Sequence, residues 1–370
     1  MPIVMRRLSI CPNSGEFGYG ALSGVANKMS IRVIQIGVGG FGESWRHTLT
    51  TTPDVEVVAL VDINETALSE ATLFFNIPKE HCIANPEEPW EEIEADILLD
   101  ATPHCNRLHH ALRAFRGGKH LIVVKPMSDK WDSALMMVKE AEKSGLKLVV
   151  AQQMRFHPVI LKLREFVQSN ILGEIGYVNL DAHFSSAGMG GSYPQPYPLL
   201  VQGSIHHFDF LRWVLGENAV SVWCDTWNPP WITGEGMRCA YVTFKMESGC
   251  RANYRAIATA TGQRSWLCDW RIEGTKGIAT VSNDQIYLNN SRVDLAWDDD
   301  SDLSDLKLPE LNKFVFQHFL AYINKNEEPG FSGRNNLNSM EMVFGAIESS
   351  ETGRRYDMSN LVIEIPQCFF

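Results

Sequence analysis

Residues 31–42 read IRVIQIGVGGFG, a short apolar run that passes directly into the pattern G-x-G-x-x-G at positions 37–42. Such a run predicts a buried strand followed by a turn and the start of a helix. In this kind of turn Gly37 permits a tight bend, Gly39 lets the backbone approach a pyrophosphate, and Gly42 lets helix and strand pack closely. The stretch therefore predicts the first strand and turn of a dinucleotide-binding fold.

An aspartate stands where a ribose-binding carboxylate is expected. The next apolar run, residues 55–61, is followed by Asp62, which lies 20 residues beyond Gly42. A carboxylate at this place accepts hydrogen bonds from the adenosine ribose hydroxyls and repels the 2′-phosphate of NADP. Because no arginine follows to receive that phosphate, we predict NAD(H) rather than NADP(H). The predicted cofactor-binding residues of this part are Gly37, Val38, Gly39, Gly40, Phe41, Gly42, Asp62 and Ile63.

Outward from this turn, apolar runs alternate with amphipathic stretches as far as residue 153. Further apolar runs at 95–101, 120–124 and 146–151 are typical of buried parallel strands. Helical patterns at 43–49, 65–75, 108–115 and 131–144 lie between the runs. This alternation predicts an α/β fold with a Rossmann-type, doubly wound parallel sheet, which binds ligands at the carboxyl ends of its strands.

The rest of the sequence has a different pattern. A strand is predicted at 176–184, successive β-type runs fill 220–289, and helical patterns occupy 158–169, 204–215, 310–324 and 336–352. We therefore predict a second α/β domain built on a large, open, mostly antiparallel sheet. The predicted division is a poorly ordered extension at residues 1–28, a dinucleotide-binding domain at 29–153 and a substrate domain at 154–370.

The composition narrows the classes of function. A formal net charge of −11 argues against nucleic acid as a partner, because phosphate binding needs a basic surface. No stretch approaches the roughly 18 consecutive apolar residues of a membrane span. The eight cysteines are scattered without a C-x-x-C pair, which is typical of reduced thiols in the cytoplasm and predicts no disulfide framework. No set of residues completes a metal site, so no metal is expected.

Polar residues follow two of the predicted strands at the cofactor-binding edge. Thr102, Pro103 and His104 follow the apolar run 95–101, and Lys125 follows the run 120–124, so we predict that all four contact the cofactor. A lysine desolvated beside a nicotinamide ring can exchange a proton. Its position alone fits a surface lysine before Pro126 equally well.

Two adjacent histidines begin a predicted helix in the second half. His206 and His207 cannot face the same way on a helix, so at most one points into a cleft. Histidine is the usual general acid or base near neutral pH, yet a single histidine is more often a hydrogen-bonded structural residue. Asp209 can either orient His206 or cap the local backbone. Tyr193 can stack on a sugar ring, or it can simply cover the sheet.

Taken together, these motifs resemble the Gfo/Idh/MocA oxidoreductases from Met29 to about Tyr356. The resemblance rests on the glycine turn with Asp62 and on a set of later segments: Ala101-Thr102-Pro103 with His109, Lys125-Pro126, Arg155-Phe156-His157-Pro158, Gly173-Glu174-Ile175-Gly176, residues 205–215 and Glu348-Ser349. It implies a Rossmann domain followed by a substrate domain that often forms an oligomer interface. We therefore expect a homo-oligomer.

The resemblance also implies roles for individual residues. In the family, the lysine of Glu-Lys-Pro and the histidine of Asp-x-x-x-His line the substrate pocket, which implies Lys125 and His206 as catalytic residues. We predict Gln202, Arg155, His207 and Tyr193 as substrate-binding residues and His109 as a cofactor-binding residue. Two positions depart from the family pattern, because Val124 replaces the Glu and Gln202 replaces the Asp. Glutamine cannot take up a proton, but it can hydrogen-bond a hydroxyl.

The resulting hypothesis is an NAD(H)-dependent oxidoreductase that interconverts a secondary alcohol and a ketone on a sugar or cyclic polyol. Hydride passes to nicotinamide C4, one of His206 and Lys125 takes the hydroxyl proton, and the other polarises the oxygen. Two alternatives stay open at this point. One is an enzyme that recycles bound NAD while it cleaves a sugar derivative, and the other is a regulator that binds the dinucleotide without turnover.

Overall fold

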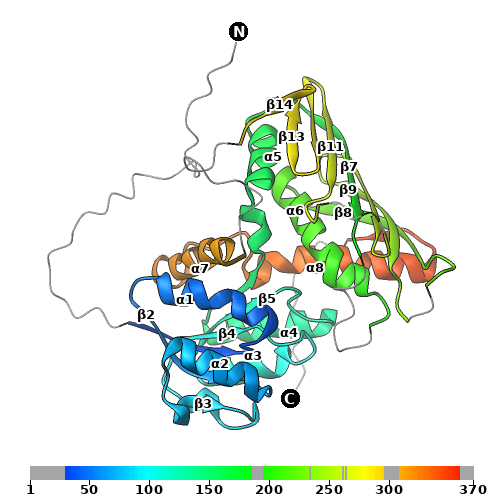
Figure 1. The fold of residues 1–370 in the computed structure, drawn as a ribbon. Coiled ribbons are helices and arrows are strands. Elements are labelled where there is room, and N and C mark those ends of the chain that lie inside the picture. The colour runs from blue at the N-terminus through cyan, green and yellow to red at the C-terminus, as the bar shows by residue number, and fades with distance from the viewer. Residues whose placement is uncertain are drawn as a thin grey trace.

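The computed structural model describes residues 30–185, 195–232, 235–260, 262, 265–295 and 308–358, and these residues form two sheets with covering helices (Figure 1). The extension predicted at residues 1–28 and the predicted substrate residue Tyr193 lie outside the described residues. Within the described part, the predicted fold class, a parallel doubly wound sheet followed by a mostly antiparallel one, is confirmed.

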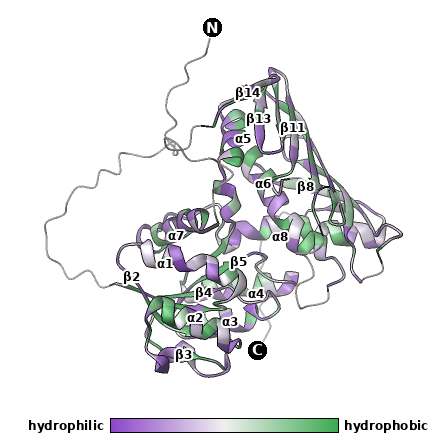
Figure 2. Cartoon of the chain, in the orientation of Figure 1, coloured by the Kyte–Doolittle hydropathy of each residue, from purple (hydrophilic) through white to green (hydrophobic). Residues whose placement is uncertain are grey.

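The first sheet has six strands in the order β3-β2-β1-β4-β5-β6, and every neighbouring pair is parallel. Its strands are β1 (Ile31–Ile36), β2 (Val55–Val61), β3 (Cys82–Ile83), β4 (Ile97–Asp100), β5 (His120–Val124) and β6 (Leu148–Ala151). Five of them match the predicted apolar runs, whereas the two-residue edge strand β3 was not predicted. In Figure 2 the interior strands β4 and β5 are hydrophobic, as expected for strands covered on both faces.

The helices of this domain follow the predicted alternation. They are α2 (Glu65–Phe75), α3 (Arg107–Arg116) and α4 (Trp131–Ser144). The helix predicted at 43–49 differs, because the glycine turn continues as a 3-10 helix, η1 (Gly40–Trp45), before α1 (Arg46–Thr51). The Asn64 side chain caps α2 by accepting hydrogen bonds from the backbone N–H groups of Thr66 and Ala67.

The second sheet has nine strands in the order β14-β13-β12-β11-β7-β10-β9-β8-β15. The strands are β7 (Ile175–His183), β8 (Ala219–Trp227), β9 (Cys239–Met246), β10 (Arg251–Ile257), β11 (Asp269–Gly274), β12 (Gly277–Ser282), β13 (Gln285–Leu288), β14 (Ser291–Val293) and β15 (Tyr356–Asp357). Only β7 and β10 pair in parallel. Burial alternates along β10, where Ala252, Tyr254 and Ala256 are buried while Arg251 and Arg255 are exposed. One face of this sheet is therefore covered and the other is open.

Three helices cover the inner face of the second sheet: α5 (Pro158–Gln168), α6 (Ile205–Leu215) and α8 (Gly333–Thr352). A π-helical turn, η6 (Leu199–Ser204), leads directly into α6. Residues of α6 and α8 share one hydrophobic core with the inner strands, including Phe208, Val222, Phe244 and Val343. Figure 1 shows α8 running from the first domain along the second sheet, so that α6 and α8 lie where the two domains meet.

Helix α7 (Leu308–Lys325) packs on the first domain although it comes late in the chain. Its Val315, Phe316 and Phe319 are buried with Val33 and Leu99 of the parallel sheet. Asn312 donates a hydrogen bond to the carbonyl of Ser44 at 3.2 Å. The core of the first domain thus includes a helix from beyond residue 153, the predicted end of that domain. No helix among the described residues is long and apolar enough to cross a membrane.

Candidate active site

The glycine turn is packed too closely for side chains at three of its positions, Gly37, Gly39 and Gly42. Gly37 has a φ of +81°, and a Cβ there would lie 2.8 Å from the carbonyl carbon of Ala101. A Cβ at Gly42 would lie 2.0 Å from the carbonyl oxygen of Gly37. Both distances are far below van der Waals contact, so the turn requires glycine to bend and to let η1 pack on the sheet.

Asp62 lies beside this turn at the end of β2. Its Oδ2 accepts hydrogen bonds from the backbone N–H groups of Val38 at 2.8 Å and Gly39 at 3.3 Å, and its Oδ1 accepts one from Asn64 at 2.8 Å. A Cβ at Gly40 would meet nothing within 4 Å, so the turn has open space on this side. An open glycine turn with a strand-end carboxylate fits the pyrophosphate and ribose of a dinucleotide. Ile63, the next predicted contact, is 73% exposed.

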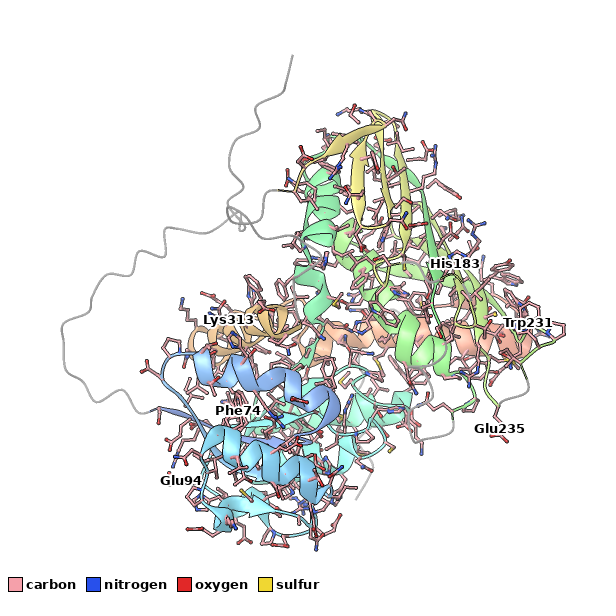
Figure 3. All side chains as sticks on the ribbon, viewed as in Figure 1. Phe74, Glu94, His183, Trp231, Glu235 and Lys313 are labelled. Atoms are coloured by element: carbon pink, nitrogen blue, oxygen red, sulfur yellow. The ribbon has the colours of Figure 1, made fainter. Side chains whose placement is uncertain are left out.

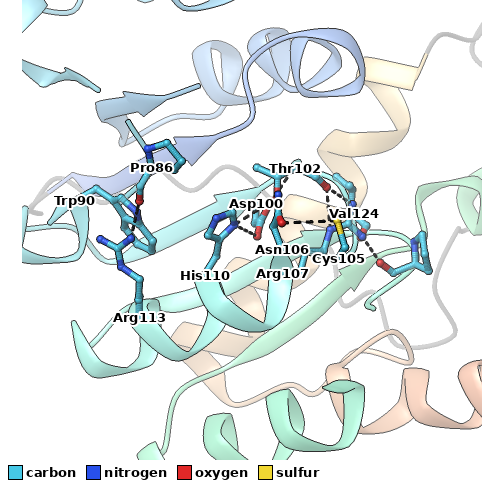
Figure 4. A network of polar contacts seen from close by, with 11 residues as sticks. Pro86, Trp90, Asp100, Thr102, Cys105, Asn106, Arg107, His110, Arg113 and Val124 are labelled. Carbon is cyan, nitrogen blue, oxygen red and sulfur yellow. Dashed lines mark hydrogen bonds and ion pairs between the residues drawn. The ribbon is translucent and has the colours of Figure 1, made fainter. Parts of the chain in front are cut away.

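The carboxyl end of β4 carries a buried polar network (Figure 4). Asp100 accepts hydrogen bonds from the backbone N–H of Thr102 at 2.8 Å and from its hydroxyl at 2.6 Å, and it contacts Nδ1 of His110 at 3.0 Å. Burial opposes ionisation of Asp100, yet His110, Arg107 and Thr102 together lower its pKa. This network fixes the loop that carries Thr102, Pro103 and His104.

Two histidines near this loop lie in different environments. His104 is buried and contacts the side chain of Gln195, next to the second domain. His109 lies on the outer side of α3, where its side chain is 52% exposed and its Nε2 is 3.5 Å from Glu87. The contact of His109 in the structure is with Glu87, and its predicted binding of the cofactor stays a prediction.

Lys125 joins the two domains at the carboxyl end of β5. Its peptide bond to Pro126 is cis, and its Nζ donates a hydrogen bond to the backbone carbonyl of Gln202 in η6 at 2.9 Å. Burial, together with the positive charge of Arg107, lowers the pKa of Lys125 to about 8. An amine with such a pKa exchanges protons readily near neutral pH.

His206 lies one helical turn beyond Gln202, in the first turn of α6. Its ring is buried against Trp266 and Phe210, with ring centroids 6.0 and 6.2 Å away. Its Nδ1 has no hydrogen-bond partner among the described residues. Burial, then the charges of Lys125 and His207, lower the pKa of His206 well below its usual value, so the imidazole is neutral at pH 7.

His207 faces the interior of the second domain. Its ring nitrogens contact the hydroxyl of Tyr254 at 2.7 Å and the backbone carbonyl of Trp266 at 3.0 Å. The residue is fully buried, and burial lowers its pKa to about 4. Both ring nitrogens are therefore engaged within the protein, and the predicted contact of His207 with substrate stays a prediction.

Arg155 makes its hydrogen bonds within the protein. Its guanidinium forms a buried ion pair with Asp209 and donates a third hydrogen bond to the carbonyl of Gly330 at 2.7 Å. Asp209 in turn accepts a hydrogen bond from Ser339 at 2.9 Å. Arg155 therefore ties η4 (Gln153–Phe156) to α6 and to the segment before α8, and its predicted contact with substrate stays a prediction. Because the Asp209 carboxylate is bound to Arg155 and Ser339, it neither orients His206 nor caps the helix.

Asp100, His110 and Arg107 were not among the residues predicted from the sequence. Asp100 left a signal, because a carboxylate that ends the otherwise apolar strand Ile97–Asp100 needs a buried partner. Arg107 left none, since nothing in the chain order shows that its guanidinium reaches the carbonyls of Val124 and Pro126. Among the described residues, no group of three or more His, Cys, Asp or Glu residues could hold a metal ion.

The site combines a glycine turn that fits a dinucleotide with two groups at the domain junction, a lysine with a lowered pKa and a neutral histidine. This combination is typical of an NAD-binding oxidoreductase. Two family models match the chain: the NAD-binding Rossmann fold of the oxidoreductase family over residues 31–152 and its C-terminal α/β domain over residues 164–358. The chain therefore belongs to the Gfo/Idh/MocA family of oxidoreductases, and its first domain binds NAD.

Individual relatives agree with this membership. The chain is 22% identical to an inositol 2-dehydrogenase of Rhizobium meliloti, over 90% of this chain and all of that protein. An Agrobacterium radiobacter oxidoreductase crystallised with NAD+, L-tartaric acid and magnesium is 18% identical, with a TM-score of 0.77 over 89% of this chain and 98% of that one. The WlbA dehydrogenase of Bordetella pertussis, crystallised with NADH and UDP-GlcNAcA, matches the same shares with a TM-score of 0.75 and 18% identity.

Proposed function

We propose that the protein interconverts a secondary alcohol and a ketone on a sugar, a cyclitol or a sugar derivative, with NAD(H) as cofactor. The observation that carries the proposal is the contact of Lys125 Nζ with the Gln202 carbonyl, which brings an amine of the NAD-binding domain to the turn that precedes His206. Relatives named for inositol, and one bound to a nucleotide sugar, support a polyhydroxylated substrate. When bound, the nicotinamide accepts or supplies the hydride.

The chain's own residues handle the proton. Lys125 is the group that exchanges a proton with the substrate oxygen, because its pKa of about 8 lies close to the working range. His206 is neutral and hydrogen-bonds the same oxygen, which keeps it oriented. Gln202, whose predicted side-chain contact with a substrate hydroxyl stays a prediction, contributes its backbone carbonyl to hold Lys125.

This assignment fixes the sign of the pH dependence. Alcohol oxidation needs the neutral amine of Lys125, so its rate falls about tenfold per pH unit below about pH 8. Ketone reduction needs the ammonium form, so its rate falls above the same pH. Initial rates in both directions between pH 6 and 10 test this, and a flat profile in both directions would contradict the role of Lys125.

The decisive experiment is a panel of sugars, cyclitols and sugar derivatives assayed with NAD and NADP by absorbance of the reduced nicotinamide. Lys125→Met should abolish turnover while NADH affinity stays within about threefold, since the variant leaves the glycine turn intact. Lys143→Met, an exposed change on α4, serves as the control. Turnover that survives Lys125→Met sinks the proposal. Binding without turnover in the natural protein indicates a regulator, and product without net NADH indicates recycling of bound NAD.

We also propose that the protein self-associates through the open face of the second sheet. Tyr177, Trp223 and Tyr241 expose 38, 46 and 48% of their surface on β7, β8 and β9. A pocket on the same sheet is lined by Asp181, His183, Tyr241, Arg255, Ile257 and Asp269, of which His183 is labelled in Figure 3. Light scattering of the natural protein and of Tyr241→Lys tests this, because a monomer in both contradicts self-association.

We also propose that the protein works in a reducing compartment such as the cytoplasm. Six cysteines lie in the described residues, namely Cys82, Cys105, Cys224, Cys239, Cys250 and Cys268, and all six are free thiols. Burial raises the pKa of Cys224 to about 12, which keeps this thiol protonated and unreactive. Free thiols of this kind fit a reducing compartment such as the cytoplasm.

A further inference from the structure

Arg107 is a buried cation that the proposed reaction does not yet use. It lies in the first turn of α3, is 3% exposed, and points toward the ends of β4 and β5 (Figure 4). Its guanidinium donates to the carbonyl of Thr102 through Nε at 3.1 Å and Nη2 at 2.6 Å. Its Nη1 donates to the carbonyls of Val124 and Pro126. These last two carbonyls belong to the residues on either side of Lys125.

The partners of Arg107 are carbonyl groups, so none of its hydrogen bonds neutralises it. The carboxylates that act on its charge are Asp100 and Asp129, and the hydrogen bonds of its guanidinium to the three carbonyls involve neither of them. Burial lowers the pKa of Arg107 to about 10, which leaves the group charged at neutral pH. A positive charge therefore persists behind the loop that carries Lys125.

Among the residues that the structure describes, no carboxylate contributes to the pKa shift of Lys125. The titratable groups that face the amine are Arg107 from α3, His104 from the preceding loop, and His206 and His207 from α6. Its hydrogen-bond acceptor is the neutral carbonyl of Gln202. Residue 124, the immediate neighbour, is a valine, so no carboxylate from β5 offsets the charge of Arg107.

A second layer holds Arg107 in place. Thr102, whose carbonyl receives two of the guanidinium N–H groups, is fixed by its hydroxyl and N–H donating to Asp100. His110 supports Asp100 from the next turn of α3 and contacts Trp90 edge-on, with ring centroids 6.2 Å apart. The guanidinium is thus held by a network that begins in β4 and ends at the Lys125 loop.

We propose that Arg107 is a positioning residue, whose guanidinium anchors the backbone on both sides of Lys125 and whose charge favours the neutral form of the Lys125 amine. The inference rests on the proposed function of Lys125 as the proton-exchanging group. It assigns two separable effects to one side chain. Hydrogen bonding sets where the amine lies, and the charge sets how easily the amine loses its proton.

Two substitutions separate these effects. Arg107→Gln removes the charge but keeps an N–H donor for the carbonyls, whereas Arg107→Lys keeps the charge but loses the planar fork that reaches three carbonyls. Arg116→Gln, an exposed arginine at the end of the same helix, is the matched control. Thermal unfolding and NADH affinity of each variant establish that the fold and the dinucleotide site are intact.

The readout that needs no substrate is competitive acetylation of the amines with acetic anhydride over a range of pH, followed by peptide mass spectrometry. We expect Arg107→Gln to raise the pKa of Lys125 by about one pH unit toward 10.5, which leaves about tenfold less neutral amine at pH 7. Arg107→Lys and Arg116→Gln should leave that pKa near 8. An unchanged pKa in Arg107→Gln overturns the electrostatic role, whether or not a substrate is known.

Turnover gives the second readout. Oxidation by Arg107→Gln should fall about tenfold at pH 7 and recover as the pH approaches 9, because only the fraction of neutral amine has changed. Arg107→Lys should lose turnover equally at all pH values, since geometry rather than charge is altered. Full turnover in Arg107→Lys overturns the anchoring role. If the natural protein turns over no substrate, the proposed function fails, while the acetylation result still decides the effect of Arg107 on Lys125.

Discussion

The glycine turn differs in construction from the Lys125 site, by which we mean Lys125, Gln202 and His206. The turn is one continuous stretch of backbone, and it is packed so closely that Gly42 and Gly37 leave no room for a side chain. The Lys125 site is made of segments far apart in the chain, since Lys125 and Gln202, whose backbone carbonyl accepts its hydrogen bond, are separated by 77 positions. Substitutions in the turn should therefore affect dinucleotide binding sterically. Substitutions at the Lys125 site should affect turnover through charge and through the hydrogen bonds that hold the site.

The largest expected effect is on the free energy of unfolding, and it concerns the buried ion pair between Arg155 and Asp209. Arg155→Met leaves Asp209 buried without its cation and should lower the free energy of unfolding by about 3–5 kcal/mol. Arg355→Met, which removes an exposed pair with Asp357, should cost no more than about 1 kcal/mol. Urea denaturation of both variants measures this. A loss below 1 kcal/mol in Arg155→Met would show that the domain junction does not depend on this pair.

A steric change in the turn comes next. Gly42→Ala places a Cβ against the carbonyl oxygen of Gly37 and should weaken NADH binding at least about 100-fold, or about 2.7 kcal/mol. Gly176→Ala, where a Cβ meets nothing within 4 Å, should leave binding unchanged. Calorimetric titration with NADH distinguishes the two. If Gly42→Ala kept its affinity for NADH, the turn could relax around a side chain, and steric packing would not distinguish it from the Lys125 site.

Asp62 is expected to set the preference for NAD over NADP through its charge. Asp62→Ala removes the carboxylate that repels a 2′-phosphate, so the preference for NAD over NADP should fall about tenfold, or about 1.4 kcal/mol. Glu65→Ala, an exposed carboxylate in the first turn of α2, is the control. Parallel titrations with both dinucleotides measure the ratio, and an unchanged preference refutes the ribose role.

An effect of similar size on stability, with little change in turnover, sharpens the distinction between the two adjacent histidines. Tyr254→Phe leaves Nδ1 of His207 buried without its partner and should cost about 1–2 kcal/mol of stability, with turnover within a few-fold of normal. Tyr241→Phe, at an exposed tyrosine, should change stability by less than about 0.5 kcal/mol. Thermal unfolding with parallel rate measurements tests both. A large loss of turnover without loss of stability would return His207 to the active site.

Most of the first domain could be predicted, because its signals are local. Strands β1 and β2 and helices α2 and α4 begin and end at the residues that the apolar periodicity indicated, with Asn64 as a visible cap for α2. Strand β3 was missed because two residues carry no periodicity. Helix α7 was placed correctly along the chain but not in space, since only the packed structure shows that its apolar face completes the first domain.

The candidate site was predictable in part. The motifs and the family resemblance selected Lys125 and His206, and the structure brings their segments together. The same reasoning selected Arg155, His207 and His109, whose partners turned out to be Asp209, Tyr254 and Glu87. Residue type cannot distinguish a polar group that faces a cleft from one whose hydrogen bonds are satisfied internally, because the partners lie up to 54 positions away.

The sequence alone determined that a strand enters a glycine turn, that an aspartate follows at the right separation, and that a second, mostly antiparallel sheet comes after the first. These features follow from the spacing of neighbouring residues and from the absence of side chains, which chain order records directly. The tertiary structure decided which histidine keeps a ring nitrogen without a partner among the described residues, which arginine forms the buried ion pair with Asp209, and which cation lies behind Lys125. Those outcomes depend on burial and charge contributed by distant segments, and these become defined only when the two domains pack together.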